Sequence, residues 1–230
     1  PYAGTVIWEM IMRSNDNGDL IFFQYYDASN DIVYNISEQY TFLINDVMGG
    51  LFSPIELNIN ITDTLNIELL DGWNWISINL STINSSTESV LEILGDNALF
   101  VRSLSGTATN YGSEYGWYGS LVMIEPSQMY KLQLNEPSEL IVTGIPIDVL
   151  ETPISLISGW NWLGYLPKHS SRLSLALDEI NVNGAIILSQ EAHSQYYDGF
   201  GWYGSLEYMH PGKGYKLYMP ESKSFMYPEI

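Results

Sequence analysis

Cysteine is absent from the 230-residue sequence, which excludes disulfide bonds, thiolate metal sites and cysteine nucleophiles. Basic residues are scarce as well: eight Lys and Arg stand against 27 Asp and Glu, giving a formal net charge of −19 at pH 7. A field of that sign repels phosphate backbones, so we expect no nucleic-acid partner. No run of 18 apolar residues occurs, and we therefore expect no membrane span.

Histidine is also rare, and catalytic motifs are missing. The three histidines, His169, His193 and His210, are scattered along the chain, and neither a HExxH nor a GxSxG motif is present. So acidic a chain offers many carboxylate pairs of the glycosidase kind, and nothing singles one out. We therefore expect that the protein is not an enzyme and has no cofactor, although its charge would attract Ca²⁺.

Aromatic and turn-forming residues are what the sequence has in abundance. It contains 17 Tyr, 7 Trp and 19 Gly, and much of its remaining polar content is Asn, Ser and Thr. This composition favours strands and turns over long helices. It is also common on secreted proteins, so we expect an extracellular or cell-surface location. The chain opens with PYAGTVIWEM, without an initiator Met, which indicates a mature product or a piece of something longer.

The first 66 residues predict an antiparallel β-module. Apolar or alternating runs are separated by Asp, Asn and Gly turns, and these runs are TVIWEMIMRS, LIFFQYYDA, DIVYNI, QYTFLIN and IELNINIT. Five or six strands in residues 1–66 would make part of a β-sandwich with an exposed sheet face. We expect either that strands before Pro1 are missing or that another domain or subunit covers this face.

The remainder of the chain is a duplication. GWNW at residues 72–75 recurs at 159–162, an offset of 87, and NALFVRSLS matches GAIILSQEA at the same offset. YGWYGSL recurs as FGWYGSL, and IEPSQMYKLQL as MHPGKGYKLYM, both at an offset of 85. Matched blocks in one order indicate homologous units, which we place at residues 67–150 and 151–230. The change of offset predicts that two residues are lost from the turn before GWYGSL.

Both units predict the same small α+β fold. A strand carries GWNW, and a short helix follows, with Ser86 as N-cap and Gly95 as C-cap in the first unit. Further strands include YKLQL and YKLYM. The predicted fold class is mainly β with short helices: a partial antiparallel β-sandwich followed by two tandem homologous α+β repeats.

The GWNW segments allow two interpretations. Alternate residues of a strand share a face, so the two tryptophans of each segment point together. They could form a stacking platform for sugar rings, as in carbohydrate-binding modules. We favour packing of the rings in the core of each unit or between the units. The residues predicted as structural core are Trp73, Trp75, Trp160, Trp162, Tyr130 and Tyr215.

Aromatic residues also gather in two Gly-rich turns, NYGSEYGWYG and QYYDGFGWYG. Rings spaced by glycine at a hairpin tip are hard to bury, and Tyr and Trp supply rigid contact area. We predict a contact surface for a ligand or subunit there, the alternative being a cluster that caps the core. The candidates are Tyr111, Tyr115, Trp117, Tyr118, Tyr196, Tyr197, Trp202 and Tyr203.

Two oxygen-rich turns and four sequons are the remaining candidate sites. SNDNGD and YDASND have carboxylates at spacings that suit Ca²⁺, but neither completes a twelve-residue calcium loop, so turn formation is the simpler explanation. The candidate Ca²⁺ ligands are Asp16, Asp19, Asp27 and Asp31. In a eukaryotic host, the Asn-x-Ser/Thr sequons predict glycosylation at Asn35, Asn60, Asn79 and Asn84.

The motifs GWNW, GWYGSL and PGKGY, followed by a closing strand, resemble repeated modules of large secreted and surface proteins. Such modules occur in Bacteroidota that use type IX secretion and in related marine and algal proteins. The segment LIFFQYYDASNDIVYNISEQYTFLINDV similarly resembles the back half of a β-module that precedes them. The resemblance implies an extracellular, non-catalytic accessory or adhesive role. As partners we expect neighbouring domains of the parent chain or other subunits, with glycans as a further candidate. The first unit departs from the pattern, because EPSQMY stands in place of PGKGY.

Together these features predict a non-catalytic structural or adhesion segment of a larger secreted or surface protein, such as part of a filament or stalk. The alternative is a carbohydrate-binding module that uses the Tyr- and Trp-rich hairpin tips.

Overall fold

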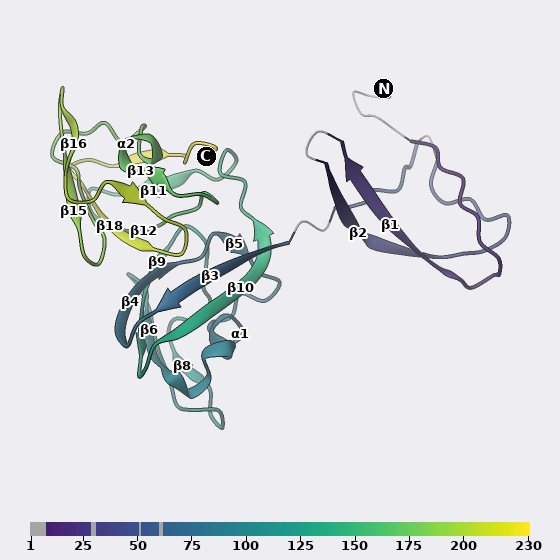
Figure 1. Cartoon of the computed structure of the whole chain (residues 1–230), viewed down its shortest axis with the longest axis horizontal. Helices are drawn as coiled ribbons and strands as arrows, with labels where there is room; N and C mark the ends of the chain where they lie inside the picture. Colours follow the sequence, from purple (N-terminus) through teal and green to yellow (C-terminus); the bar gives the residue numbers. More distant parts are fainter. Residues whose placement is uncertain (1–7, 29–30, 51, 60–61) are drawn as a thin grey trace. The chain divides into compact units, whose positions relative to one another are not determined.

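A computed structural model describes residues 8–28, 31–50, 52–59 and 62–230. The chain divides into two compact units, residues 1–61 and residues 62–230. The described residues form mainly antiparallel β-sheets with two short α-helices (Figure 1). Among the described residues, no helix has the length and apolar character needed to cross a membrane.

The regular structure of the first unit is a two-stranded antiparallel sheet. Strand β1 (Leu20–Asp27) pairs with β2 (Ile32–Thr41). Two strands therefore form among the described residues where the sequence predicted five or six. Residues 32–36 of DIVYNI and the first three residues of QYTFLIN belong to one strand, because no Gly, Pro or Asn separates the two runs. The described part of TVIWEMIMRS, residues 8–14, forms no strand. IELNINIT contributes an isolated bridge between Ile59 and Ile36, and residues 5–7 and 60–61 of these two runs lie outside the described residues.

The first unit buries little apolar surface. Tyr40 is the one buried hydrophobic residue in its described part, whereas Phe22, Tyr26 and Val47 are each more than half exposed. A lone two-stranded hairpin is at best marginally stable in water. Apolar side chains of this unit are therefore exposed, and the covering strands, domain or subunit expected from the sequence stay a prediction.

Each half of the second unit is built on a five-stranded antiparallel sheet. The strands of the first sheet are β4 (Gly72–Ser77), β6 (Ala98–Arg102), β7 (Thr107–Asn110), β8 (Trp117–Gly119) and β9 (Met129–Leu134). Those of the second are β12 (Gly159–Gly164), β14 (Ile186–Leu188), β15 (His193–Tyr197), β16 (Gly201–Gly204) and β18 (Gly214–Met219). The spatial orders, β4-β9-β6-β7-β8 and β12-β18-β14-β15-β16, are equivalent. The two halves thus share one topology.

Smaller elements pack behind each sheet. In the first repeat they are β3 (Asp63–Leu69), β5 (Leu80–Ser81), α1 (Thr87–Leu91), a 3₁₀ helix (Glu92–Asn97) and β10 (Ser138–Pro146). In the second they are β11 (Ile154–Leu156), β13 (Ser171–Arg172), α2 (Leu173–Ala176), β17 (Tyr208–Met209) and β19 (Lys223–Phe225). Strand β3 pairs with β10 along its whole length. The border expected after residue 66 therefore lies inside β3, and the first repeat already includes the start of β3 at Asp63.

The local helix signals are correct in part. The Ser86 hydroxyl accepts the backbone N–H of Ser89 at 3.2 Å and caps α1, as predicted. Gly95 is not the C-cap of α1, because the chain continues into the 3₁₀ helix. There Gly95 adopts φ 51° and ψ −136°, a conformation that glycine tolerates best.

Each repeat has its own hydrophobic core, formed between the inner face of its sheet and the elements behind it. Tyr130 and Tyr215, both predicted as core residues, are each 1% exposed. Their hydroxyls accept the backbone N–H groups of Glu125 at 2.7 Å and His210 at 2.8 Å. The same buried tyrosine therefore supports the same bend in both copies.

The sequence placed the loss of two residues in the turn before GWYGSL, and the strand registers show that this is only half correct. Ala98 faces Leu134 and Phe100 faces Gln133, so Leu99 is an extra residue in a bulge of β6. The equivalent strand β14 has no register shift against β18. One of the two residues is therefore this bulge residue, and only the other falls in the turn before GWYGSL. A bulge leaves the side-chain pattern on both sides intact, which is why the sequence match alone misplaced it.

Candidate functional site

The GWNW motif forms a clamped turn at the start of an edge strand. Gly72 and Gly159 adopt φ values of 74° and 100°, which glycine reaches without strain. The buried Asn74 side chain accepts the N–H of Leu70 at 2.9 Å and donates to its carbonyl at 2.8 Å. Asn161 makes the equivalent pair of bonds to Ile157, both at 2.9 Å. The asparagine is therefore structural in both copies.

Packing in a core or between the units was predicted for all four tryptophans, and for Trp73 and Trp160 it is wrong. Trp73 and Trp160 are 42% and 44% exposed and lie on the outer face of their sheets. Asn74 and Ile76 alternate with them and point into the core instead. The neighbouring strand β9 explains this orientation. Its polar residues Gln133 and Lys131 pair with Trp73 and Trp75 on the outer face, whereas its Leu132 and Leu134 are buried on the core face. The alternation was read correctly, but the wrong face was assigned to the core.

A pseudo-two-fold axis relates the two repeats. The N–H of Ser77 donates to the carbonyl of Gly212 at 3.1 Å, and the N–H of Gly164 donates to the carbonyl of Ser127 at 2.8 Å. Gly164 is the repeat equivalent of Ser77, and Gly212 is that of Ser127, so each bond is the image of the other. Isolated bridges join the adjacent residues in the same reciprocal way. Such self-complementary exchange is the geometry of a two-fold dimer interface, here within one chain.

The inner tryptophans and two lysines meet at this axis. The Lys131 ammonium lies 4.6 Å from the centre of the Trp75 ring and 5.6 Å from that of Trp162. Lys216 lies 4.8 Å from Trp75 and 5.2 Å from Trp162. The Arg102 guanidinium is 5.4 Å from the Trp162 ring. We call these five residues the cation–aromatic cluster. Trp75 and Trp162 therefore pack between the repeats, which was one of the two arrangements favoured from the sequence.

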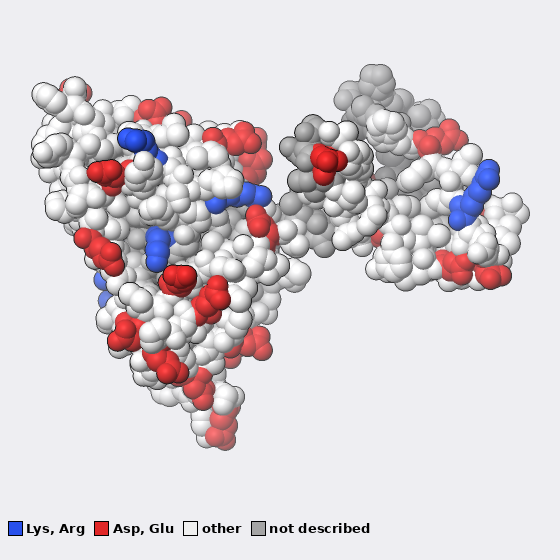
Figure 2. All heavy atoms as spheres, viewed as in Figure 1, with Lys and Arg blue, Asp and Glu red and all other residues white. Residues whose placement is uncertain are grey.

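The cluster gathers positive charge in an acidic protein. Figure 2 shows acidic side chains spread over the visible face of the second unit, with few Lys and Arg among them. Burial lowers the pKa of the Lys131 ammonium, and the charges of Lys216 and Arg102 lower it further. Sequence reasoning missed these three cations. A signal was available: Lys131 and Lys216 occupy equivalent positions in YKLQL and YKLYM, opposite Trp75 and Trp162 in the register.

The hairpin tips divide into outer and inner rings. Tyr111, Tyr115, Tyr118, Tyr197 and Tyr203 are exposed. Of the remaining predicted contact residues, Trp117 and Trp202 pack against the cores and Tyr196 lies beside Trp202, with ring centres 5.6 Å apart. Phe200, at the second tip, is 91% exposed. The inner rings therefore cap the core, which was the alternative interpretation, while contact of the exposed outer rings with a ligand or subunit stays a prediction.

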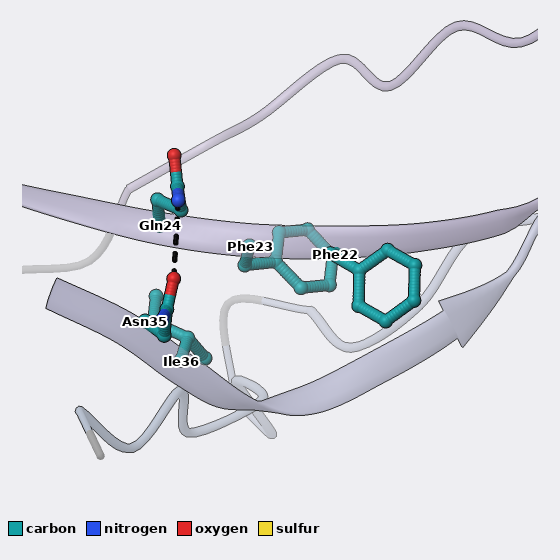
Figure 3. Close-up of a pocket in the computed structure, with 5 residues that line it drawn as sticks. All are labelled: Phe22, Phe23, Gln24, Asn35 and Ile36. Atoms are coloured by element: carbon teal, nitrogen blue, oxygen red, sulfur yellow. Dashed lines mark hydrogen bonds between the residues drawn. The ribbon is translucent and has the colours of Figure 1, made fainter.

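A hollow of about 490 Å³ lies on the β1–β2 hairpin of the first unit (Figure 3). Its lining residues are Phe22, Phe23, Gln24, Asn35 and Ile36. Gln24 Nε2 donates to Asn35 Oδ1 at 3.1 Å, so the two amides partly satisfy one another. None of these five lining residues has a titratable side chain, and the hollow combines apolar groups with the two amides.

A second hollow, of about 480 Å³, lies between strand β4 and the second repeat. The Gln190 side chain spans it: the N–H of Trp75 donates to Oε1 at 2.8 Å, and Nε2 donates to the carbonyl of Trp73 at 2.7 Å. These bonds occupy the free edge of β4. An outside strand is thereby kept from pairing with that edge.

The oxygen-rich turns hold their carboxylates by internal bonds. Asp19 accepts bonds from the Ser14 hydroxyl and the Asp16 N–H, and these bonds hold the pKa of its carboxyl below the usual range. The Tyr26 hydroxyl donates to Asp31 at 2.8 Å. Within the described parts of the chain, no three His, Cys, Asp or Glu converge as metal ligands would. Ca²⁺ binding by Asp16, Asp19, Asp27 and Asp31 stays a prediction.

The sequons differ in accessibility. Asn35 and Asn84 are exposed, whereas Asn79 is buried and its Nδ2 donates to the carbonyl of Pro167 in the other repeat at 3.2 Å. A glycan on Asn79 would separate the repeats, so glycosylation predicted there is wrong for the folded chain. Asn60 lies outside the described residues.

Comparisons with models of protein families, with curated protein sequences and with solved structures give no match.

Proposed function

We propose that this chain is a non-catalytic structural or adhesion segment of a larger extracellular or cell-surface protein. The observation that carries the proposal is the pair of hairpin tips. The hairpin tip of each repeat carries aromatic rings that are exposed to solvent, among them Tyr118 in the first repeat and Tyr203 in the second. Exposed apolar area of this kind is typical of protein contact surfaces.

The scaffold beneath the tips suits such a role. The inner tip tryptophans, Trp117 and Trp202, anchor each tip to its own core, and reciprocal backbone bonds fix one repeat to the other. Rings held on rigid supports lose little conformational entropy when they bind. Two tips on one rigid unit can also engage two partners, or two sites on one partner, which strengthens attachment.

Light scattering of the whole chain over a range of concentrations tests this proposal. We expect self-association, and we expect the double variant Tyr118→Ser/Tyr203→Ser to abolish it without changing the unfolding midpoint. Ile83→Ser is the control, because Ile83 is fully exposed and belongs to neither tip sequence. A chain that stays monomeric, and that shows no tip-dependent retention on coated surfaces, would contradict the proposal.

Carbohydrate binding is the second candidate function. It is favoured by Trp73 and Trp160, whose rings are open to solvent on sheet faces rather than buried. Each ring has an edge-on aromatic neighbour that fixes its orientation: Phe100 at 5.9 Å for Trp73 and Tyr218 at 5.4 Å for Trp160. Oriented, exposed rings can stack on sugar rings. This site lies on the GWNW segments, which were considered from the sequence as a stacking platform, and not on the hairpin tips. A glycan array with the Trp73→Ala and Trp160→Ala variants tests it.

A further inference from the structure

The three cations of the cation–aromatic cluster have no acidic side chain paired with them in the described structure. Arg102, Lys131 and Lys216 are three of the eight Lys and Arg in a chain with 27 Asp and Glu. In the described structure, none of the three forms an ion pair, whereas Lys168 pairs with Asp63 at 3.3 Å elsewhere in the same unit. Like charges this close repel one another. A bound anion would remove that repulsion.

Solvent reaches all five residues of the cluster. Arg102 is exposed, and the two lysines and the two indoles are each only partly buried. Each lysine ammonium lies over the Trp75 ring and over the Trp162 ring. These contacts restrain the two ammonium groups. A guanidinium beside restrained ammonium groups can bind one carboxylate or sulfate group through several charged hydrogen bonds.

Two further tryptophan rings lie next to the cluster, one on β4 and one on β12. Trp73 precedes Trp75 by two residues and Trp160 precedes Trp162 by two, so each pair shares one face of its strand. The outer rings are exposed. A ligand that combines an anionic group with flat, partly apolar rings on either side would fit this sequence of groups.

We propose that the cation–aromatic cluster binds the carboxylate or sulfate group of an acidic polysaccharide, whose neighbouring sugar rings lie on Trp73 and Trp160. This inference rests on the carbohydrate-binding candidate and specifies its ligand class. Acidic sugars combine both required features in one chain.

Nucleic acid fits less well. Duplex DNA carries one charge per about 1.7 Å of its axis, and three cations on a protein of net charge −19 cannot offset that density. An acidic polysaccharide has fewer charges for the same length, and its rings contribute apolar contact. Duplex DNA therefore serves as the competing ligand in the test.

The pseudo-two-fold axis sets the number of sites. Both repeats contribute one Lys and one Trp to the same cluster, so the chain has one site instead of two. Arg102 breaks the symmetry, because its equivalent in the second repeat is Leu188, which faces Lys216 as Arg102 faces Lys131. The ligand should therefore bind with a stoichiometry of one and in one direction across the axis.

Calorimetry of the whole chain with matched oligosaccharides tests the inference. The ligands are a carboxylated galacturonan, a sulfated galactan, a neutral galactan and duplex DNA. We expect one acidic oligosaccharide to bind at one site per chain, with an affinity that falls as salt rises. We expect Lys131→Met/Lys216→Met to weaken that binding by roughly tenfold or more, as the loss of a charged hydrogen bond does.

Controls separate the possible failures. Lys213→Met removes an exposed lysine outside the cluster and should leave binding unchanged. Arg102→Gln supplies a second variant on an exposed side chain if the double variant does not fold. If neutral and acidic sugars bind equally, the inference fails while the carbohydrate candidate stands. If no sugar binds, both fail, and binding of DNA at the same residues would overturn the choice of ligand class.

Discussion

The hydroxyl of Ser77 donates a hydrogen bond to the backbone carbonyl of Lys213 at 2.7 Å, joining the first repeat to the second. The same hydroxyl accepts the N–H of Tyr165 at 3.2 Å, and Ser77 is fully buried. At the equivalent position across the pseudo-two-fold axis stands Gly164, which has no side chain. The interface is therefore symmetric in its backbone bonds and asymmetric in its side chains.

Ser77→Ala should destabilise the second unit by about 1–3 kcal/mol, because a buried donor and a buried acceptor lose their partner. Urea unfolding measures the change. Ser81→Ala removes a hydroxyl from an exposed serine on β5 and is the control. A loss no larger than that of the control would show that the hydroxyl does not hold the repeats together.

Gly164→Ala tests how closely the repeats approach. A Cβ at Gly164 would lie 2.8 Å from the carbonyl oxygen of Gln128 and 2.8 Å from the carbonyl carbon of Ser127, both backbone atoms of the other repeat. Backbone cannot rotate away as a side chain can, so we expect a loss of about 1–3 kcal/mol. Gly50→Ala, where a Cβ meets nothing within 4 Å, is the matched control. An unchanged unfolding midpoint for Gly164→Ala would mean that the repeats are less tightly joined.

The sequence predicted the mainly β class and the repeated motifs because both depend on local patterns of apolar, Gly and Asn residues. It could not decide which face of β4 is buried, since Trp73 and Ile76 are both apolar. That choice depends on Leu132 and Gln133 in β9, which reaches β4 only through the fold. The cation–aromatic cluster was missed for the same reason: its lysines come from strands 85 residues apart, and only the pseudo-two-fold axis brings them together.

Asn161→Ala should loosen the turn that precedes β12. Its amide bonds the N–H and the carbonyl of Ile157 and also donates to the carbonyls of Gly159 at 3.1 Å and Leu217 at 3.3 Å. Because the side chain is buried, alanine would leave these groups unsatisfied, and we expect a loss of about 2 kcal/mol.

Thermal or urea unfolding checks the Asn161 prediction, and hydrogen exchange at Ile157 locates the effect. Asn181→Ala, at an exposed asparagine in the same repeat, is the control. Equal stabilities of Asn161→Ala and Asn181→Ala would contradict a clamping role for the motif asparagine.

Alkaline pH should destabilise the second unit through its buried tyrosines. Burial raises the pKa of Tyr130 and of Tyr215 to about 12, above the ordinary value of 10.0, and it raises the pKa of Tyr227 as well. The folded state therefore keeps protons that the unfolded state releases. The stability that this provides is fully present below pH 10 and is lost as pH rises from 10 towards 12.

Each of Tyr130 and Tyr215 should contribute on the order of 2 kcal/mol to this loss. Urea unfolding between about pH 8 and about pH 11 measures the slope, and ultraviolet absorbance of the phenolate shows whether ionisation accompanies unfolding. Tyr130→Phe should flatten the slope even though it lowers stability at neutral pH by removing the bond to Glu125. Tyr118→Phe controls for the loss of a phenol at an exposed site. If Tyr130→Phe leaves the slope unchanged, its hydroxyl is not the group that alkali titrates on unfolding.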